Sequence, residues 1–471
     1  MRRRILTLLT ATLLIFGVGF MLMGCGSDDG SDDGVARLLY TFWGSDMERR
    51  AQMDAVEMFN QLHEGRIVVT PLHIPAGGGE YATRMTAMQA AGNNPDVGYM
   101  ATGQAFVWAQ EGIFFNIFDL IDADPYWTAD MFVENIFYMY AEGRSFGTTS
   151  SINPFALFYD PAVFDEHGVP HPPNNYADAW TWDQFIYYAR LLTIDMNGNN
   201  ATHPDFDHTR VRQWGAHFNP DDISILHIML DSNGADLLNE EGTALALNTP
   251  QAKEVLQKLY DMIYVHRISP IPADYANLPT GPNAIHNRQF AMVATGYWNI
   301  LDFHTMEVPF EVGVLPRIRY PRNIILAGTR VIWADTEYPE AAWELYTFLA
   351  DPAGAMNLYR YGLWMPTLVE WYTDRDKFEQ WAGEGSAHPP NFEPVFVYPL
   401  FNGVATPNWV LRVANFEELI NMTVRPGLQQ LWFDDMTVDQ VVADVEARAN
   451  PFVRGWNPGN YHASHYHNWG N

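Results

Sequence analysis

Trp43 and Ser45 stand where an apolar run ends and a helical pattern begins, a position suited to binding a ligand without covalent chemistry. The run Leu38–Phe42 has the length and composition of a strand, and Gly44 breaks it. In an open α/β sheet, ligands bind at the edge where strands lead into helices. There an indole can stack on a flat ligand face while Ser45 or Asp46 hydrogen-bonds beside it. The alternative for Trp43 is a place in the hydrophobic core.

The elements that would position these residues follow from hydrophobic periodicity. Ser45 and Glu48 have the spacing of a capping box, and apolar residues then recur at helical spacing until Gly65 ends the pattern. The next expected elements are a strand over 67–74, a helix over 80–91 and a strand over 96–100. This β-α-β-α-β order predicts an α/β fold with a parallel sheet and right-handed crossovers.

The middle of the chain is predicted to connect a first domain to a second. The small and polar residues Gly143–Asn153 are expected to form that crossing, and the apolar run 154–159 restarts a strand. A short helix should follow over 161–167, and Thr181 should cap a helix ending at Leu192. Later helices are expected over 223–232, 250–264, 339–349, 416–422 and 438–449, and strands over 291–295 and 311–315.

Length and composition exclude several classes of function. A chain of 471 residues with 48% hydrophobic and 18% charged residues should form two or three folded domains. Its formal net charge of −29 disfavours nucleic acid as a partner, because phosphate backbones are bound by clustered Lys and Arg. No lysine follows a glycine-rich loop, and Gly77–Gly79 lacks dinucleotide-binding spacing, so no phosphate cofactor is expected. No HExxH motif occurs.

The amino terminus has the pattern of an exported protein. Arg2–Arg4 precede an apolar run over 5–20, and Leu-Met-Gly then leads directly into Cys25, the sole cysteine. This resembles the bacterial lipobox, which predicts a signal peptide over 1–24, lipidation of Cys25 and attachment to the membrane. Residues 25–34, rich in Ser, Asp and Gly, should form a flexible tether. The alternative is an uncleaved anchor helix.

Several motifs, in order, resemble one family. They are Phe42-Trp43-Gly44, Asn94-Pro95-Asp96-Val97, Ala156-Leu157-Phe158-Tyr159-Asp160, Trp180-Thr181-Trp182-Asp183-Gln184-Phe185, Gly296-Tyr297-Trp298-Asn299, Val312-Gly313-Val314-Leu315-Pro316 and Pro339-Glu340-Ala341-Ala342-Trp343. Together with the lipobox, they resemble extracellular solute-binding proteins of ABC importers. The nearest branch is family 1, the maltose-binding-like group that collects sugars. The similarity extends from Leu38 to about Val453.

The resemblance implies a periplasmic-binding-protein-like α/β fold of two lobes joined by a hinge, with a ligand cleft between them. The first lobe would comprise 35–150 and 323–362. The second would comprise 151–322 and 363–454, and 455–471 would form a tail. Such a protein binds a carbohydrate, delivers it to ABC permease subunits, acts extracytoplasmically as a monomer and catalyses no reaction. Closure of the lobes on the ligand would be a hinge motion.

The resemblance also suggests where ligand contacts lie. A sugar needs aromatic platforms for its C–H faces and polar side chains for its hydroxyls, and the chain contains 16 Trp and 23 Tyr. Trp298 matches a sugar-stacking position of the family, with core packing as the alternative. Arg330 could clamp hydroxyls or a carboxylate, with a structural ion pair as the alternative. The remaining candidates are Gln104, Asn153, Tyr159 and Trp364.

Two other functions stay open from the sequence. One is a secreted carbohydrate-active enzyme, which would need two carboxylates on either side of the bound sugar. The other is a binder of a non-sugar solute such as a peptide or polyamine, for which an acidic cleft is suited.

Two patterns resemble metal sites. Asp195–Asn199 resembles the start of a calcium loop, but Asn200 and Phe206 stand where such a loop needs Gly and Glu, so an Asx-rich turn is favoured. The tail carries three histidines, for which a mobile segment is the default and metal binding the alternative. These histidines are His462, His465 and His467.

Overall fold

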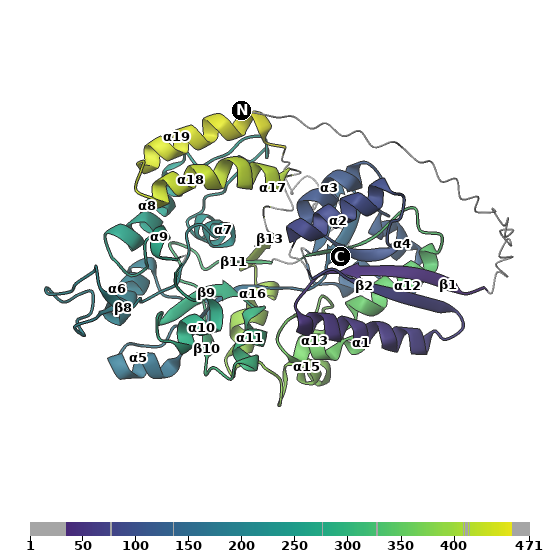
Figure 1. Cartoon of the computed structure of the whole chain (residues 1–471), viewed down its shortest axis with the longest axis horizontal. Coiled ribbons are helices and arrows are strands. Elements are labelled where there is room, and N and C mark those ends of the chain that lie inside the picture. The colour runs from purple at the N-terminus through teal and green to yellow at the C-terminus, as the bar shows by residue number, and fades with distance from the viewer. Residues whose placement is uncertain are drawn as a thin grey trace, which may run out of the picture. The chain divides into compact units, whose positions relative to one another are not determined.

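The computed structural model describes residues 34–75, 78–134, 136–275, 277–325, 328–407, 409, 413 and 415–454 (Figure 1). The expected signal peptide, Cys25, the tether before Gly34 and the tail with its three histidines lie outside these residues. Within the described ranges, no helix is both long enough and apolar enough to cross a bilayer.

Two main sheets organise the described residues. The larger has the strand order β2-β1-β3-β12-β5-β4 and the smaller β10-β6-β9, beside the strand pairs β11-β13 and β7-β8. The strands are β1 (Ala36–Phe42), β2 (Ile67–His73), β3 (Val97–Met100), β4 (Phe137–Ala141), β5 (Arg144–Thr149), β6 (Phe155–Tyr159), β7 (Ile194–Asp195), β8 (Val211–Gln213), β9 (Met292–Gly296), β10 (Glu311–Gly313), β11 (Asn323–Ile325), β12 (Thr329–Ile332) and β13 (Ala405–Pro407).

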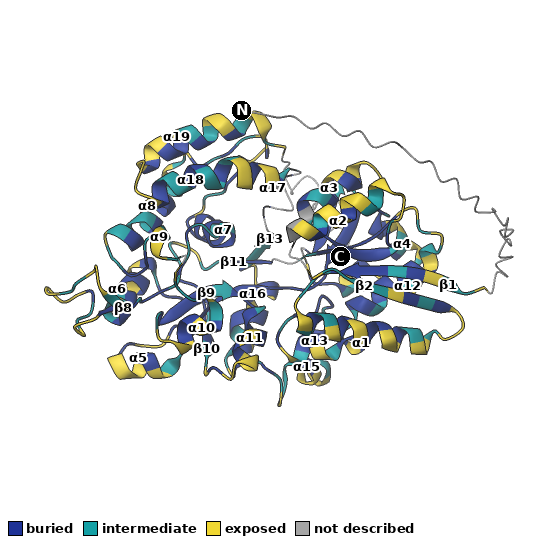
Figure 2. Ribbon diagram, viewed as in Figure 1, coloured by how far each residue is buried: buried dark blue, intermediate teal, exposed yellow. Residues whose placement is uncertain are grey.

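Helices surround both sheets. They are α1 (Asp46–Leu62), α2 (Gly78–Ala90), α3 (Thr102–Gln110), α4 (Ile117–Ala123), α5 (Pro161–His167), α6 (Trp182–Leu192), α7 (Ile223–Ser232), α8 (Pro250–Tyr264), α9 (Pro272–Tyr275), α10 (Gly281–His286), α11 (Asn299–Thr305), α12 (Pro339–Ala350), α13 (Met356–Arg360), α14 (Glu370–Thr373), α15 (Arg375–Ala382), α16 (Tyr398–Phe401), α17 (Phe416–Leu419), α18 (Arg425–Trp432) and α19 (Val438–Ala449). Figure 2 shows the sheet strands largely buried, while the helices carry exposed residues on their outer sides.

The turn from β1 into α1 forms as the sequence predicts, with one difference. Ser45 caps α1 by accepting the Glu48 backbone N–H at 3.3 Å. The Glu48 side chain does not complete a capping box, because its carboxyl is buried against Gly44. Gly44 has φ +141°, and a Cβ there would overlap this carboxyl, so the turn requires glycine.

The larger sheet is mixed rather than wholly parallel. β1 pairs in parallel with β2 and β3, which confirms the β-α-β-α-β prediction for these three strands. β12 then pairs antiparallel with both β3 and β5. α1 and α12 pack against the β1–β3 part of the sheet, while α3 and α4 pack against β5.

The prediction that Gly143–Asn153 is a crossing was wrong for most of its length. Residues 144–149 form β5, between β4 and β12. The small side chains that suggested a loop are needed for close packing, because a Cβ on Gly147 would overlap the Arg330 carbonyl oxygen. The connection to β6 is therefore shorter and begins after Thr149.

Most other expected elements are confirmed. α7 and α8 have the predicted bounds, and α6 begins with a capping box between Thr181 and Gln184. The helix expected over 416–422 continues instead through a π-helical segment, Ile420–Val424, into α18. β11 pairs with β13, so a strand expected in the first lobe pairs with a segment expected in the second.

Candidate functional site

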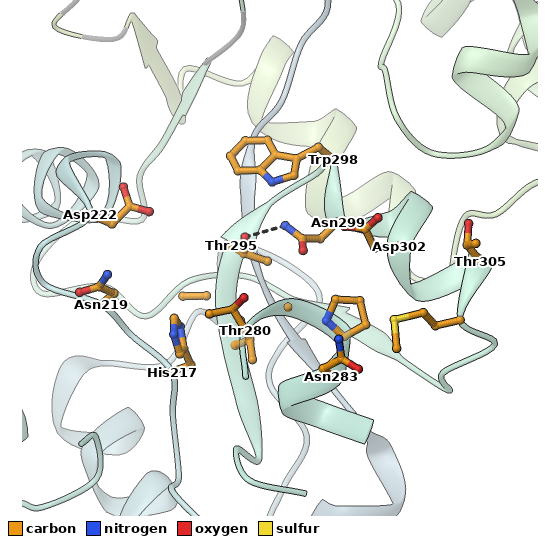
Figure 3. A pocket seen from close by; sticks show the side chains of 15 residues that line it. His217, Asn219, Asp222, Thr280, Asn283, Thr295, Trp298, Asn299, Asp302 and Thr305 are labelled. Carbon is orange, nitrogen blue, oxygen red and sulfur yellow. Dashed lines mark hydrogen bonds between the residues drawn. The ribbon is translucent and has the colours of Figure 1, made fainter. Parts of the chain in front are cut away.

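A cavity of about 540 Å³ opens at the end of β9 and is the best candidate for the ligand site (Figure 3). β9 leads into α11, the strand-to-helix geometry at which α/β proteins bind ligands. One large aromatic side chain, that of Trp298, faces a set of polar ones. The polar residues include His217, Asn219, Asp222, Thr280, Asn283, Thr295, Asn299, Asp302 and Thr305.

The indole of Trp298 is held in place by its neighbours. Trp298 precedes α11, and its ring lies edge-to-face against Phe155, with centroids 5.5 Å apart. A Cβ on Gly296 would overlap the six-membered ring of Trp298, so the Gly-x-Trp spacing lets the indole fold back over the strand. Trp298 is only partly buried and lines the cavity, which leaves it able to stack on a ligand.

The polar groups opposite Trp298 are fixed, but their hydrogen-bonding capacity is not used up. Asn299 donates to the Thr295 hydroxyl at 2.8 Å. Asp222 caps α7 by accepting the Ser224 N–H at 2.9 Å. His217 has a buried Nδ1 without a hydrogen-bond partner among the described residues.

Burial shifts the pKa of His217 and of Asp302 in opposite directions. It lowers the pKa of His217 to about 4, so the ring is neutral at pH 7 and offers one donor and one acceptor. Burial also raises the pKa of Asp302 above its ordinary value. The cavity therefore carries neutral and weakly acidic groups suited to hydroxyls.

Trp43, Arg330 and Trp364 gather around Tyr99 in the larger sheet, forming a cluster that we call the Tyr99 cluster. Trp43 lies edge-to-face on Tyr99 at 4.9 Å, and Trp364 lies 6.0 Å from the same ring. The Arg330 guanidinium lies 6.0 Å from the Trp364 ring centroid and 5.8 Å from that of Tyr346. Three of the predicted residues, from distant parts of the sequence, are thus brought together.

Arg330 is buried without a matching anion. Arg330 is 1% exposed, and its Nε and Nη2 atoms have no hydrogen-bond partner among the described residues. No ion pair of Arg330 is found among the described residues, so the structural ion pair weighed from the sequence is not seen there. Planar guanidinium groups bind carboxylates and vicinal hydroxyls, which makes Arg330 a candidate for contact with a ligand.

The remaining predicted residues fall into two groups. Ser45 is used as a helix cap, and the exposed Asp46 lies 3.5 Å from Arg49. Tyr159 donates to Glu311 at 2.9 Å and lines neither the cavity nor the Tyr99 cluster.

Two predicted amides retain unused acceptors. The Gln104 Oε1 and the Asn153 Oδ1 are buried without hydrogen-bond partners among the described residues, although each side chain donates through its nitrogen, to Thr86 and to Ser151.

His217, Asn219, Asp222 and Asp302 are cavity residues that sequence reasoning missed. His217 lies on an extended segment hydrogen-bonded to β9 through Met292 and Ala294. The segment ends in the turn that Asp222 closes as the cap of α7. Trp43 was predicted as a ligand contact because it lies between a strand and a capped helix. Residues 217–222 have the same pattern, which would have predicted this cavity.

Asp195 belongs to a turn. Its carboxylate accepts the backbone N–H groups of Asn197, Asn199 and Asp207 at 2.8–2.9 Å. Among the described residues, no group of three or more His, Cys, Asp or Glu side chains is arranged to hold a metal ion. The Asx-rich turn favoured from the sequence is therefore what the structure contains.

Glu48 should make stability depend on pH. Burial raises the pKa of Glu48 to about 8, although a hydrogen bond with Tyr99 opposes this. The folded state therefore keeps a proton that the unfolded state loses above about pH 4.5, so stability should fall as the pH rises from there through about 8. Glu48→Gln should remove this slope and be more stable than wild type at pH 8 by on the order of a few kcal/mol. Melting temperatures between pH 5 and 8.5 test this, and parallel curves for the two proteins would contradict it.

Comparison with known proteins identifies the family. The chain matches the family described as "Bacterial extracellular solute-binding protein" over residues 44–356, more than half of its length. An arabinooligosaccharide-binding protein of Halalkalibacterium halodurans is 29% identical over 141 residues. That match spans 30% of this chain and only 27% of the relative.

Solved structures share the fold. An ABC substrate-binding protein of Listeria monocytogenes in complex with cycloalternan has a TM-score of 0.73 at 18% identity, covering 88% of this chain and 98% of that one. The maltose/maltodextrin-binding domain of Bdellovibrio bacteriovorus bound to maltotriose has a TM-score of 0.67 at 16% identity, covering 88% and 99%. These likenesses show the periplasmic-binding-protein fold of two α/β lobes. With the family match over most of the chain, they show that the protein belongs to the bacterial extracellular solute-binding proteins of ABC transporters.

Proposed function

We propose that this protein captures an oligosaccharide outside the cytoplasm, held to the membrane by a lipid on Cys25, and delivers it to an ABC permease. The observation that carries the proposal is the cavity beside β9, in which the Trp298 indole faces His217, Asn219, Asn283 and other polar groups. An aromatic face opposite hydrogen-bonding side chains is what a sugar ring requires.

The relatives support the same class of ligand. The curated relative is named as an arabinooligosaccharide-binding protein, and the two solved structures hold cycloalternan and maltotriose. Each of these ligands is an oligosaccharide. An oligosaccharide therefore stands ahead of a peptide or polyamine for this chain.

The Tyr99 cluster supplies the second wall in this proposal. Trp43 would stack on the sugar from the first lobe while Trp298 does so from the second. Arg330 and the unused oxygens of Gln104 and Asn153 would take its hydroxyls. Contacts from both lobes favour the closed state, so ligand binding would drive closure.

A thermal-shift screen tests the ligand class. Arabino- and malto-oligosaccharides, mixed peptides and polyamines are added to the purified protein, and a specific ligand raises the melting temperature according to its concentration over its Kd. We expect an oligosaccharide to produce the shift. A shift only with a peptide or polyamine would show the ligand class to be wrong, and release of reducing ends would show an enzyme.

Cys25→Ser should abolish attachment of the lipid and the cleavage that follows it. Cys25 is the sole cysteine, so fatty-acid labelling of the wild type can occur at no other thiol. We expect the label to disappear in the variant and the signal peptide to stay uncleaved, whereas Ser27→Ala should keep both labelling and cleavage. An unlabelled, uncleaved wild type would indicate the uncleaved anchor helix instead.

A further inference from the structure

The cavity beside β9 carries negative charge without a positive charge in its wall. Two carboxylates line it, those of Asp222 and Asp302, and within the described residues no lysine or arginine does. Figure 3 shows these two side chains on either side of Trp298. The further titratable side chain in the wall, that of His217, is neutral at pH 7 because burial lowers its pKa to about 4. A ligand therefore meets a wall whose net charge is negative.

Asp302 is the carboxylate whose charge has no partner. It lies on α11 and is accessible to solvent. Partial burial raises its pKa, and no hydrogen bond or cation from the described residues opposes this rise. A cationic group placed beside Asp302 would lower the free energy of the charged carboxylate, and an anionic group would raise it.

Asp222 adds a second negative charge that its helix holds in place. Its carboxylate caps α7 by accepting the Ser224 N–H at 2.9 Å. Burial raises its pKa, while the hydrogen bonds with Ser224 and the charge of Arg425 oppose the rise. Arg425 does not line the cavity, so a ligand there meets the carboxylate rather than the guanidinium.

Trp298 is an independent feature that favours a cation. The face of an indole is the negative part of its quadrupole and attracts an ammonium group within about 6 Å of the ring centroid. Trp298 lines the same cavity and is only partly buried. An accessible aromatic face together with an unpaired carboxylate is the chemistry that recognises an ammonium group.

The neutral polar groups of the wall favour a sugar as the carrier of that cation. Asn219, Asn283 and Thr280 line the cavity and can pair with hydroxyls. A linear polyamine offers no hydroxyl to these groups, whereas an amino sugar offers hydroxyls and an ammonium group together. The volume of about 540 Å³ also lies in the range of small-molecule sites.

We propose that the cavity beside β9 selects an oligosaccharide in which one sugar unit carries a free amino group, with the ammonium beside Asp302 and the face of Trp298. The charges of Asp222 and Asp302 exclude acidic sugars by repulsion. This rests on the proposed function, because the cavity must first be a sugar site. It narrows the substrate class from oligosaccharides in general to amino-sugar oligosaccharides.

Calorimetry on the detergent-solubilised full chain tests the proposal with three probes that share one β-1,4 backbone. They are chitotriose, which carries amines, cellotriose, which is neutral, and cellotriouronic acid, which carries carboxylates. At about pH 6, where primary amines are protonated, we expect chitotriose to bind about tenfold more tightly than cellotriose, and cellotriouronic acid to bind most weakly. Raising the salt from about 0.01 M to about 1 M should reduce the advantage of chitotriose, since cellotriose carries no charge.

Matched variants assign the effect to the cavity. Asp302→Asn removes the charge and keeps the shape, and it should reduce the ratio of the cellotriose Kd to the chitotriose Kd to about two. Asp222→Asn keeps a helix cap, because asparagine caps as well as aspartate, and it should narrow the gap between cellotriose and cellotriouronic acid about threefold. Asp54→Asn, which removes an exposed carboxylate of α1 outside this cavity, should leave the ratios unchanged.

The contrary outcomes separate this inference from the proposed function. A ratio near one in the wild type, a ratio that Asp302→Asn or salt leaves unchanged, or equal binding of the acidic probe overturns the amino-sugar preference. If chitotriose does not bind while a neutral oligosaccharide raises the melting temperature, this inference has failed and the proposed function stands. If no saccharide of any charge binds, the proposed function has failed and this inference fails with it.

Discussion

Trp298→Ala is expected to raise the Kd for the oligosaccharide about 100-fold, the scale of a binding hot spot, with a small loss of stability. The indole is partly exposed and its ring is supported on one side by Phe155, so the face toward the cavity is free for a ligand. Calorimetry gives the change in Kd, and thermal melting of the unliganded protein gives the change in stability.

Trp127→Ala is the matched control for this prediction. Trp127 is also partly buried and packs on Tyr126 and Phe132, but it does not line the cavity beside β9. We expect it to leave the Kd within about twofold of wild type, as for a substitution far from the contact surface. Equal losses of affinity in the two variants would show that Trp298 is a packing residue.

Arg330→Met is expected to stabilise the unliganded protein by about 1–3 kcal/mol and to weaken ligand binding at the same time. The guanidinium is buried without a carboxylate among the described residues, and methionine fills similar space without a charge. Replacing a buried charge with an apolar side chain removes its desolvation cost. Denaturant unfolding and calorimetry measure the two effects.

Arg66→Met provides the comparison for Arg330. Arg66 is exposed and makes two hydrogen bonds of 2.6 Å to Glu344. Removing such a surface pair should change stability by less than about 1 kcal/mol. A loss of stability in Arg330→Met larger than in Arg66→Met would mean that the stacking on Trp364 and Tyr346 outweighs the cost of burying the charge.

The elements that sequence reasoning predicted are those fixed by neighbouring residues. The cap at Ser45, the capping box at Thr181 and the bounds of α7 and α8 depend on residues within one or two helical turns. Such signals are local, so a single sequence contains them.

What the sequence did not reveal depends on distant contacts. β5 looked like a linker because Gly147 is small, and only its contact with the Arg330 backbone explains the glycine. The Tyr99 cluster likewise joins Trp43, which follows β1, with Arg330 of β12 and Trp364, which follows α13. Sequence reasoning selected each of these residues separately. Their contact with one tyrosine depends on the order of the strands in the sheet, which the sequence motifs do not contain.

The place of β12 inside the larger sheet governs the order in which this protein can fold. β12 lies between β3 and β5, both of which belong to the first third of the chain, yet it follows every strand of the smaller sheet in the sequence. Until residue 332 is available, β3 and β5 have no strand to join them, and the sheet remains split. Pairings between such distant segments form slowly, because a long loop must close first. The larger sheet is therefore completed late in folding.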